Sequence, residues 1–186
     1  QMATPSSRAT MKEFCLRRLG KPVIEINIDD DQMDDRIDEA LLYFQDYHFD
    51  GVETTWLKHQ ITQTDIDNNY ITITDSNTIG IVDEMLVGKQ PIRYNRHQNR
   101  LSVDMDWQKV NVDDYLIAKV YKKLDPDTYT DVWGDRWLQR YVTALFQVQW
   151  GKNLTKFTGM QLPGGVQFNG EQILQQGMDE KNKLEE

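Results

Sequence analysis

The pattern of apolar and polar residues is most regular between residues 29 and 51. Apolar side chains and one histidine recur there at spacings of 4, 3, 1, 3 and 4 residues, namely Met33, Ile37, Ala40, Leu41, Phe44 and His48. Such spacings place these side chains on one face of an α-helix, which has about 3.6 residues per turn. The sequence therefore predicts an amphipathic helix of about five turns, ended by Asp50 and Gly51.

A shorter helix is predicted before it. Thr10 is followed three residues later by Glu13, an arrangement typical of a capping box at a helix start. Gly20 is a typical helix end. The apolar face of this helix comprises Met11, Phe14, Cys15 and Leu19. Residues 1–9 are polar and are expected to form a flexible arm.

Between residues 52 and 122 the pattern changes to a period of two, which is typical of strands. Trp56, Lys58 and Gln60 alternate with Leu57, His59 and Ile61. We predict strands over 56–61, 70–73, 92–94, 101–107 and 115–121, with a turn at 65–69. The third and fourth of these strands form a hairpin, so a small antiparallel sheet is expected in the middle of the chain.

The helical period returns after residue 125. A helix is predicted from about 135 to 157, and Asn169 is expected to cap a polar C-terminal helix over 171–186. The apolar stripe of the first of these helices is wide enough to be buried on two sides. It comprises Trp133, Trp137, Leu138, Tyr141, Val142, Leu145, Phe146 and Val148.

These elements predict an α+β fold, a helical bundle with a long central helix and a small antiparallel β-sheet inserted in the middle of the chain. The 186 residues fit a single domain, residues 1–186. Within it we expect helices over 10–50, a β-rich insertion over 52–122 and helices over 125–186.

The charge of the chain limits its partners. Thirty acidic residues against 21 basic ones give a formal net charge of −9. Broad attraction to DNA or to an anionic membrane is therefore not expected. No window approaches the roughly 20 apolar residues of a membrane span, so no membrane partner is predicted.

Five aspartates stand close together: Asp29, Asp30, Asp31, Asp34 and Asp35. A calcium loop of the EF-hand type needs glycine at its sixth position and glutamate at its twelfth. Counted from Asp29, these positions hold Asp34 and Ala40. We therefore favour a helix start, where carboxylates cap free N–H groups and face the positive end of the helix dipole. An α+β module that binds calcium or another metal through 29–35 is the alternative.

No catalytic or cofactor site is predicted. Cys15 is the only cysteine and is interpreted as a core side chain, because no histidine follows at a recognisable spacing. The three histidines, His48, His59 and His97, lack the spacing of metal ligands. Gly164-Gly165 lacks the Lys-Ser/Thr of a phosphate loop and is interpreted as a turn. We expect no enzyme activity and no cofactor.

One basic segment departs from the acidic composition. The tip of the predicted hairpin, residues 93–100, carries Arg93, Arg96, His97 and Arg100. Arginine forms bidentate contacts with phosphates and with carboxylates, so the tip suits nucleic acid or an acidic protein, and a solvated turn is the alternative. Tryptophan is favoured both in cores and between subunits, so the tryptophans of the long helix fit either place.

Three long blocks of the sequence carry a family resemblance. They read FCLRRLGKPVIEINIDDDQMDDRIDEALLYFQDYHFDG, PIRYNRHQNRLSVDMDW and KLDPDTYTDVWGDRWLQRYVTALFQVQWGKNLTKFTGMQLPGGVQFNGEQI. They resemble the neck, or head-completion, proteins of T-even-type contractile-tailed bacteriophages, especially those of cyanophages. Together the blocks span most of residues 10–186.

The resemblance implies a structural virion protein without enzymatic activity, made in the host cytoplasm and located in the neck between head and tail. It implies an adaptor ring of about twelve copies beneath the portal of the filled head. The ring would bind the portal protein on one side and the next neck (stopper) protein on the other. DNA would pass through its channel without specific binding.

A ring also needs contact surfaces. A subunit interface is predicted at Trp133, Trp137, Tyr141 and Phe146. Contacts from ring to ring are predicted at Arg93, Arg96, His97, Arg100, Ile173, Leu174 and Met178. The chain departs from the family at residues 79–85, where related proteins carry a longer middle region.

Overall fold

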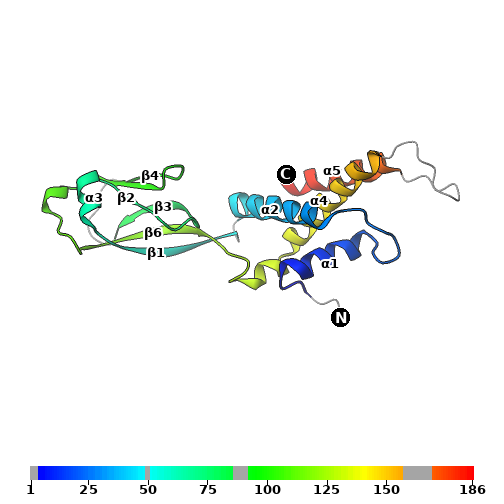
Figure 1. The fold of residues 1–186 in the computed structure, drawn as a ribbon, viewed down its shortest axis with the longest axis horizontal. Helices are drawn as coiled ribbons and strands as arrows, with labels where there is room; N and C mark the ends of the chain where they lie inside the picture. Colours follow the sequence, from blue (N-terminus) through cyan, green and yellow to red (C-terminus); the bar gives the residue numbers. More distant parts are fainter. Residues whose placement is uncertain (1–3, 49–50, 86–91, 157–168) are drawn as a thin grey trace. The chain divides into compact units, whose positions relative to one another are not determined.

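The computed structural model describes residues 4–48, 51–85, 92–156 and 169–186, and these form two compact units (Figure 1). Gln1–His48 and Pro126–Glu186 form one, called here the helical unit. Phe49–Asp125 form the other, called the β unit. The predicted α+β class, with antiparallel strands between two helical segments, is confirmed. The prediction of one domain stays a prediction, because the two units are described separately.

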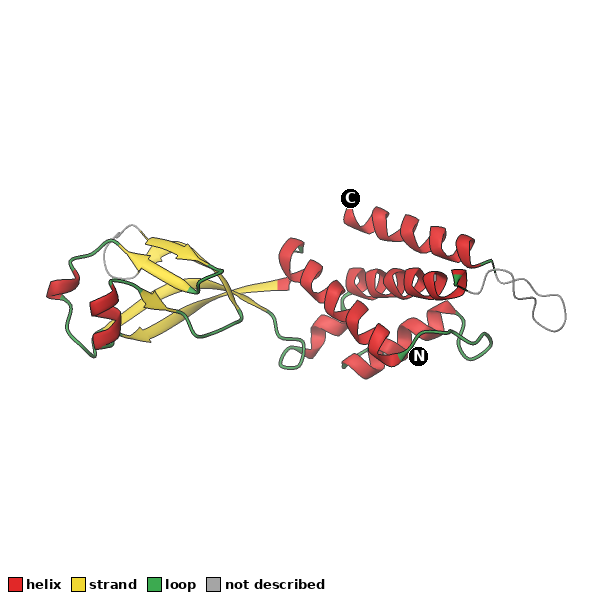
Figure 2. Ribbon diagram, turned by 45° about the horizontal axis from the view of Figure 1, so that its top comes forward, coloured by secondary structure: helices red, strands yellow, loops and turns green. Residues whose placement is uncertain are grey.

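The described part of the helical unit is built around helix α4. Its helices are α1 (Arg8–Leu19), α2 (Asp30–Tyr47), the 3₁₀ helix η3 (Thr130–Gly134), α4 (Arg136–Thr155) and α5 (Gly170–Glu185). Helix α4 packs against α1, α2 and α5 (Figure 2). The shared core contains fully buried side chains from several helices, including Met11, Ile37, Phe44, Trp133, Leu138, Tyr141 and Phe146.

Helix α2 begins as its sequence predicts. The Asp29 carboxylate accepts a hydrogen bond from the Asp31 N–H at 3.3 Å, and the Gln32 side chain accepts one from the Asp29 N–H at 3.3 Å. This capping box satisfies N–H groups that have no partner within the helix. The predicted apolar face is buried at Met33, Ile37, Ala40, Leu41 and Phe44.

The predicted start of the first helix was wrong. Helix α1 begins at Arg8, with Ser7 as its N-cap and Thr10 three positions later. The Thr10 hydroxyl accepts a hydrogen bond from the Ser7 N–H at 2.9 Å, which is the role we expected of a glutamate. Glu13 instead pairs with Lys21 at 3.0 Å. The helix ends at Gly20, as predicted, with a φ of 124°.

Helix α5 has the Asn169 cap that the sequence predicts, and α4, predicted to begin near residue 135, has Asp135 as its N-cap. The Asp135 carboxylate accepts a hydrogen bond from the Leu138 N–H at 2.8 Å, and the Asn169 side chain accepts one from the Gln172 N–H at 3.3 Å. The end of α4 was predicted at about residue 157, and a turn was predicted at Gly164-Gly165. Both positions lie outside the described residues.

Glycines bring α4 and α5 unusually close. A Cβ placed on Gly151 of α4 would lie 2.6 Å from the backbone N and Cα of Leu174. Reciprocally, a Cβ on Gly177 of α5 would lie 2.9 Å from the backbone N of Val148. The two backbones therefore touch where neither helix has a side chain, which is why a weakly apolar helix can still pack tightly.

The described strands of the β unit form two three-stranded antiparallel sheets. The first has the order β1 (Val52–Gln60), β6 (Tyr115–Lys123), β3 (Thr78–Met85). The second has the order β2 (Ile71–Thr72), β5 (Arg100–Val103), β4 (Ile92–Asn95). A short helix, α3 (Gln63–Asn68), and a 3₁₀ helix, η2 (Trp107–Lys109), complete the described part of the unit. Their common core contains Ile61, Ile71, Ile73, Leu101, Val103, Trp107, Leu116, Ala118 and Val120.

Three local predictions for the β unit were wrong. The strand predicted over 101–107 ends at Val103, because the Asp106 carboxylate accepts a hydrogen bond from Gln108 and starts η2. The turn predicted at 65–69 is mostly helix α3. Strand β3 was not predicted at all. Its pairing with β6 is interrupted by register shifts, so a regular alternation is missing there.

Candidate interaction surfaces

The aspartate cluster stands at the start of α2, where two of its carboxylates, Asp30 and Asp34, pair with basic side chains of α1. Lys12 contacts Asp30 at 2.9 Å and Asp34 at 2.8 Å, and Arg8 contacts Asp34 at 3.4 Å and Asp38 at 2.5 Å. The hydrogen bond from Lys12 holds the pKa of Asp34 below its ordinary value, assisted by the charges of Lys12 and Arg8 against the effect of burial. Two of the five carboxylates, those of Asp30 and Asp34, are thus engaged by ammonium and guanidinium groups. Within the described ranges, no three His, Cys, Asp or Glu side chains are grouped as a metal site requires.

Lys12 offers a direct test of this network. We expect Lys12→Met to lower the free energy of unfolding by about 0.5–1 kcal/mol near neutral pH, a small value because Asp30 and Asp34 are partly exposed and screened. Since the pKa of Asp34 is depressed in the folded state, its contribution is present above the unfolded pKa and disappears as the pH falls through the folded pKa. Denaturant unfolding should therefore show a difference near pH 7 that decreases as the pH falls below the ordinary value of 3.8. A difference independent of pH would show that lost packing, and not charge, is responsible.

In the β unit, His59, Thr62 and Asp65 form a polar cluster. The His59 Nε2 lies 2.9 Å from the Asp65 carboxylate, which also accepts hydrogen bonds from the Thr62 N–H at 2.9 Å and the Thr62 hydroxyl at 2.8 Å. Burial opposes ionisation of Asp65, but these hydrogen bonds keep its pKa below the ordinary value. The hydroxyl bonds to the aspartate and not to the histidine, so this is not the arrangement of a nucleophile with its base. The cluster caps α3.

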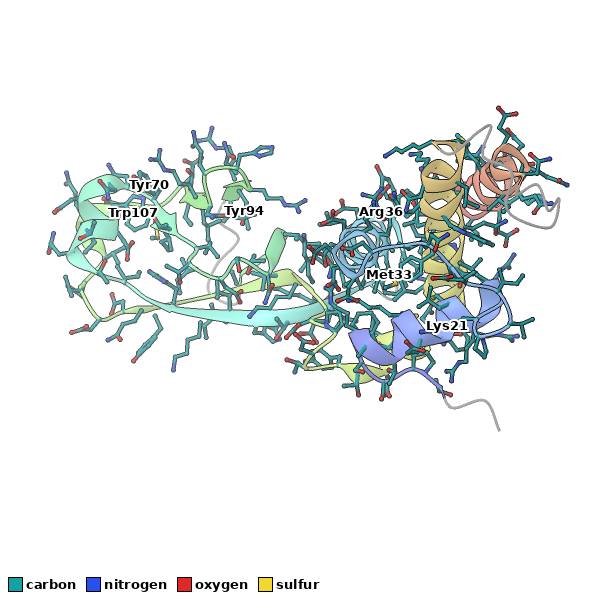
Figure 3. All side chains as sticks on the ribbon, turned by 45° about the vertical axis from the view of Figure 1, so that its right-hand side comes forward. Lys21, Met33, Arg36, Tyr70, Tyr94 and Trp107 are labelled. Atoms are coloured by element: carbon teal, nitrogen blue, oxygen red, sulfur yellow. The ribbon has the colours of Figure 1, made fainter. Side chains whose placement is uncertain are left out.

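The arginine hairpin between β4 and β5 is exposed at every predicted contact residue. Arg93, Arg96, His97 and Arg100 all lie on the surface. The Asn95 side chain accepts hydrogen bonds from the N–H groups of His97 and Gln98, at 3.0 and 3.3 Å, which shapes the turn. Arg100 lies over the Tyr70 ring, 4.5 Å from its centre, on the part of the unit where Figure 3 labels Tyr70 and Tyr94. The hairpin therefore presents a shaped, cationic tip.

The predicted contact residues of the helical unit are placed differently from one another. Trp133, Tyr141 and Phe146 are at most 1% exposed in the single chain and fill its core. Trp137 is half-buried, and its indole N–H donates to the Leu184 carbonyl at 3.1 Å. Their part in a subunit interface stays a prediction. On α5, Ile173 and Leu174 are half-buried, whereas Met178 is 43% exposed.

A surface that the sequence did not reveal lies beside these aromatic residues. Tyr43 stacks on Trp137, with 5.7 Å between ring centres, and contacts Tyr141 at 5.2 Å. The rings of Tyr43 and Tyr141, together with Glu185 at the end of α5, border an open depression of about 510 Å³. Its lining comprises Asp35, Arg36, Asp38, Glu39, Leu42, Tyr43, Asp46, Tyr47, Tyr141 and Glu185. We call it the acidic depression.

Two exposed apolar side chains distinguish the acidic depression from an ordinary polar surface. Leu42 is 52% exposed and Tyr47 is 77% exposed. On the buried side, the Tyr141 hydroxyl donates to Glu185 at 2.6 Å, and burial together with this carboxylate raises the pKa of Tyr141. Leu42, Tyr43 and Tyr47 lie outside the apolar stripe of α2. Large apolar residues on the polar side of that helix were the signal available in the sequence.

A further surface missed from the sequence is the outer face of β1 and β6. Trp56 and Tyr115 are 49% and 54% exposed there. Lys58 lies 4.2 Å from the centre of the Tyr115 ring, and Lys119 lies 5.9 Å from that of Trp56. The lysines thus cover the aromatic faces of their own sheet.

The function of these surfaces depends on the family to which the chain belongs. The chain matches the family described as bacteriophage T4 neck protein gp13, over residues 2–86 and 78–186, nearly its whole length. The chain belongs to this family. The resemblance predicted from the sequence is therefore confirmed. No match was found among solved structures.

Membership of the gp13 neck family makes the chain a structural protein of the phage neck, and so a component of the virion. The family match is divided into two segments that overlap at residues 78–86. The overlap includes residues 79–85, where the sequence was predicted to depart from the family. Among the described helices, none combines the length and the apolar character needed to cross a membrane.

Proposed function

We propose that this neck protein forms the adaptor ring that joins the portal of the filled head to the next neck ring and the tail, with DNA passing through the channel of the ring. The observation that carries the proposal is the match to the gp13 neck family along nearly the whole chain. The exposed surfaces of both units are the proposed sites of contact with other proteins of the neck. About twelve copies is the ring size that the resemblance implies.

The charge of the chain supports a passive channel. A formal net charge of −9 disfavours binding of phosphates, since a basic lining would hold DNA by releasing its counterions. We propose that acidic side chains face the channel. In the proposed ring, Arg96 and Arg100 lie away from it.

The arginine hairpin and the exposed side of α5 are the proposed contacts with neighbouring rings. Replacing Arg93, Arg96 and Arg100 together by glutamine should weaken binding to the portal or to the next neck protein about tenfold and reduce its salt dependence. Titration at two salt concentrations measures both effects. The matched control replaces Lys58, Lys119 and Lys123 of the same unit by glutamine, which removes equal charge and should leave binding unchanged. Equal losses of affinity in both variants would show that the hairpin acts only through the net charge of the chain and not as a specific contact.

Ring formation itself can be tested by mass. Native mass spectrometry of the purified chain, alone and with portal rings, should show one closed assembly whose mass is a fixed multiple of the chain mass. A chain that stays monomeric in the presence of portal rings would contradict the proposed function.

A further inference from the structure

The acidic depression has a complementary surface elsewhere on the same helical unit. At the end of α1, residues 17–24 form a segment that we call the basic loop. It carries Arg17, Arg18 and Lys21, all exposed. Val23 is 92% exposed and Ile24 is 40% exposed, so two aliphatic side chains stand in water beside three positive charges. Exposed apolar groups combined with charge on one loop are typical of contact surfaces.

The basic loop is held in shape by its own backbone. Gly20 and Lys21 donate to the Leu16 carbonyl, each at 3.1 Å, and Ile24 donates to the Gly20 carbonyl at 3.0 Å. The pair of Lys21 with Glu13 ties the loop to α1. Val23 is therefore presented on an ordered turn, which lowers the entropy lost when it binds.

The acidic depression matches this loop in both charge and apolar character. Five of its lining residues are carboxylates and one is Arg36. Some of these charges have partners, since Glu39 contacts Arg36 at 3.3 Å and Asp38 contacts Arg8. The excess is still negative, and the exposed Leu42 and Tyr47 offer apolar area for two aliphatic side chains.

One chain cannot join its own two surfaces. The basic loop precedes α2, whose first residue is Asp30, whereas Tyr47 is its last. An 18-residue helix is about 27 Å long at about 1.5 Å per residue. Figure 3 likewise labels Lys21 of the loop and Arg36 of the depression at separate places on the helical unit. A contact between the two surfaces must therefore join two copies.

We infer that the acidic depression receives the basic loop of a second copy, with Val23 and Ile24 against Leu42 and Tyr47 and with Arg17 and Arg18 beside the carboxylates. This inference rests on the proposed ring. Two different surfaces of each copy meet, so the contact is heterologous, the kind that closes a ring by repetition. The arginine hairpin fits the depression less well, because its aromatic member Tyr94 is half-buried and donates to the Thr78 carbonyl at 3.3 Å.

Cysteine cross-linking tests the contact directly. Cys15 is fully buried, so introduced thiols are the accessible ones. Val23→Cys and Tyr47→Cys both change exposed side chains and should leave the fold intact, which a thermal melt verifies. Mixed and oxidised, with and without portal rings, the two variants should give a disulfide-linked dimer, because the contact brings their Cβ atoms within range of a disulfide. Each variant alone should give none, because a heterologous contact does not place identical residues together.

Two further experiments test which surface occupies the acidic depression. Arg96→Cys on the hairpin and Asn182→Cys on the exposed side of α5 are each mixed with Tyr47→Cys, and neither should form a dimer. When Arg17→Glu and Arg18→Glu are added to the Val23→Cys chain, this chain should no longer form a disulfide-linked dimer with the Tyr47→Cys chain. When Asp35→Lys is then added to the Tyr47→Cys chain, the dimer with the charge-reversed chain should form again.

The outcomes separate this contact from the ring itself. A ring that forms without the Val23–Tyr47 cross-link overturns the inference and leaves the proposed function standing. A stronger link from Tyr47→Cys to Arg96→Cys would assign the depression to the hairpin instead, and so also overturns it. Absence of any link between copies, even at high concentration and with portal rings, overturns the inference as well, and the mass measurement then decides on the ring.

Discussion

Replacing Gly151 by alanine should lower the free energy of unfolding of the helical unit by about 2 kcal/mol. The new Cβ would meet the backbone of Leu174 at 2.6 Å, so relief requires α5 to move as a whole. Overpacking of this kind costs about 1–3 kcal/mol, and a clash with backbone belongs at or above the upper end. Alanine gains about 1 kcal/mol of helix propensity over glycine, which offsets only part of the cost.

Thermal or denaturant unfolding, followed by helical circular dichroism, measures this loss. Lys152→Ala is the matched control, because Lys152 is the exposed neighbour of Gly151 on the same turn and should change stability by less than about 0.5 kcal/mol. Gly177→Ala should act like Gly151→Ala, and the double variant should lose less than the sum, because one displacement of α5 relieves both clashes. An alanine at 151 that stabilises the helical unit would show that α5 does not pack at this distance.

The second large effect is expected in the β unit. Asp65→Asn should destabilise this unit by about 1–2 kcal/mol near neutral pH, because hydrogen bonds to a charged acceptor are worth about 1.5–3 kcal/mol and asparagine retains only part of them. The pKa of Asp65 lies below its ordinary value of 3.8 in the folded chain. Its stabilisation is therefore present above the unfolded pKa and is lost as the pH falls through the lower folded pKa.

Hydrogen exchange of peptides from the β unit, compared near pH 7 and near pH 3 after correction for intrinsic rates, resolves this loss from events in the helical unit. The difference between the two chains should be clear near neutral pH and smaller in acid. Asp67→Asn serves as the control, since Asp67 is exposed on the same short helix and bonds only to Gln63 among the contacts described. A loss that persists unchanged in acid would contradict an ionised Asp65.

Local signals explain which parts of the fold the sequence predicted. The stripe from Met33 to Phe44 and the cap at Asn169 depend on neighbours within a few residues, so they could be predicted directly from the sequence. Ser7 was missed because a threonine hydroxyl replaced the expected glutamate in the capping box. Strand β3 depends on a distant and irregular pairing with β6, which no local period reports.

The candidate surfaces also differ in whether a local signal in the sequence predicts them. The arginine hairpin was visible because its basic residues lie within eight positions of the sequence, 93–100, and its turn is local. The acidic depression joins residues of α2, Tyr141 of α4 and Glu185 of α5, which come together only through tertiary packing. The close approach of α4 and α5 had a signal in Gly151 and Gly177, two glycines within helical patterns, but small residues matter there only once the partner helix is known.

The central claim is that this chain forms a ring on the portal. Electron microscopy of the chain mixed with portal rings tests it most directly. We expect a single closed ring, coaxial with the portal, with acidic side chains toward an open channel. Portal rings that carry no added density, or a ring whose channel is lined by Arg96 and Arg100, would contradict it.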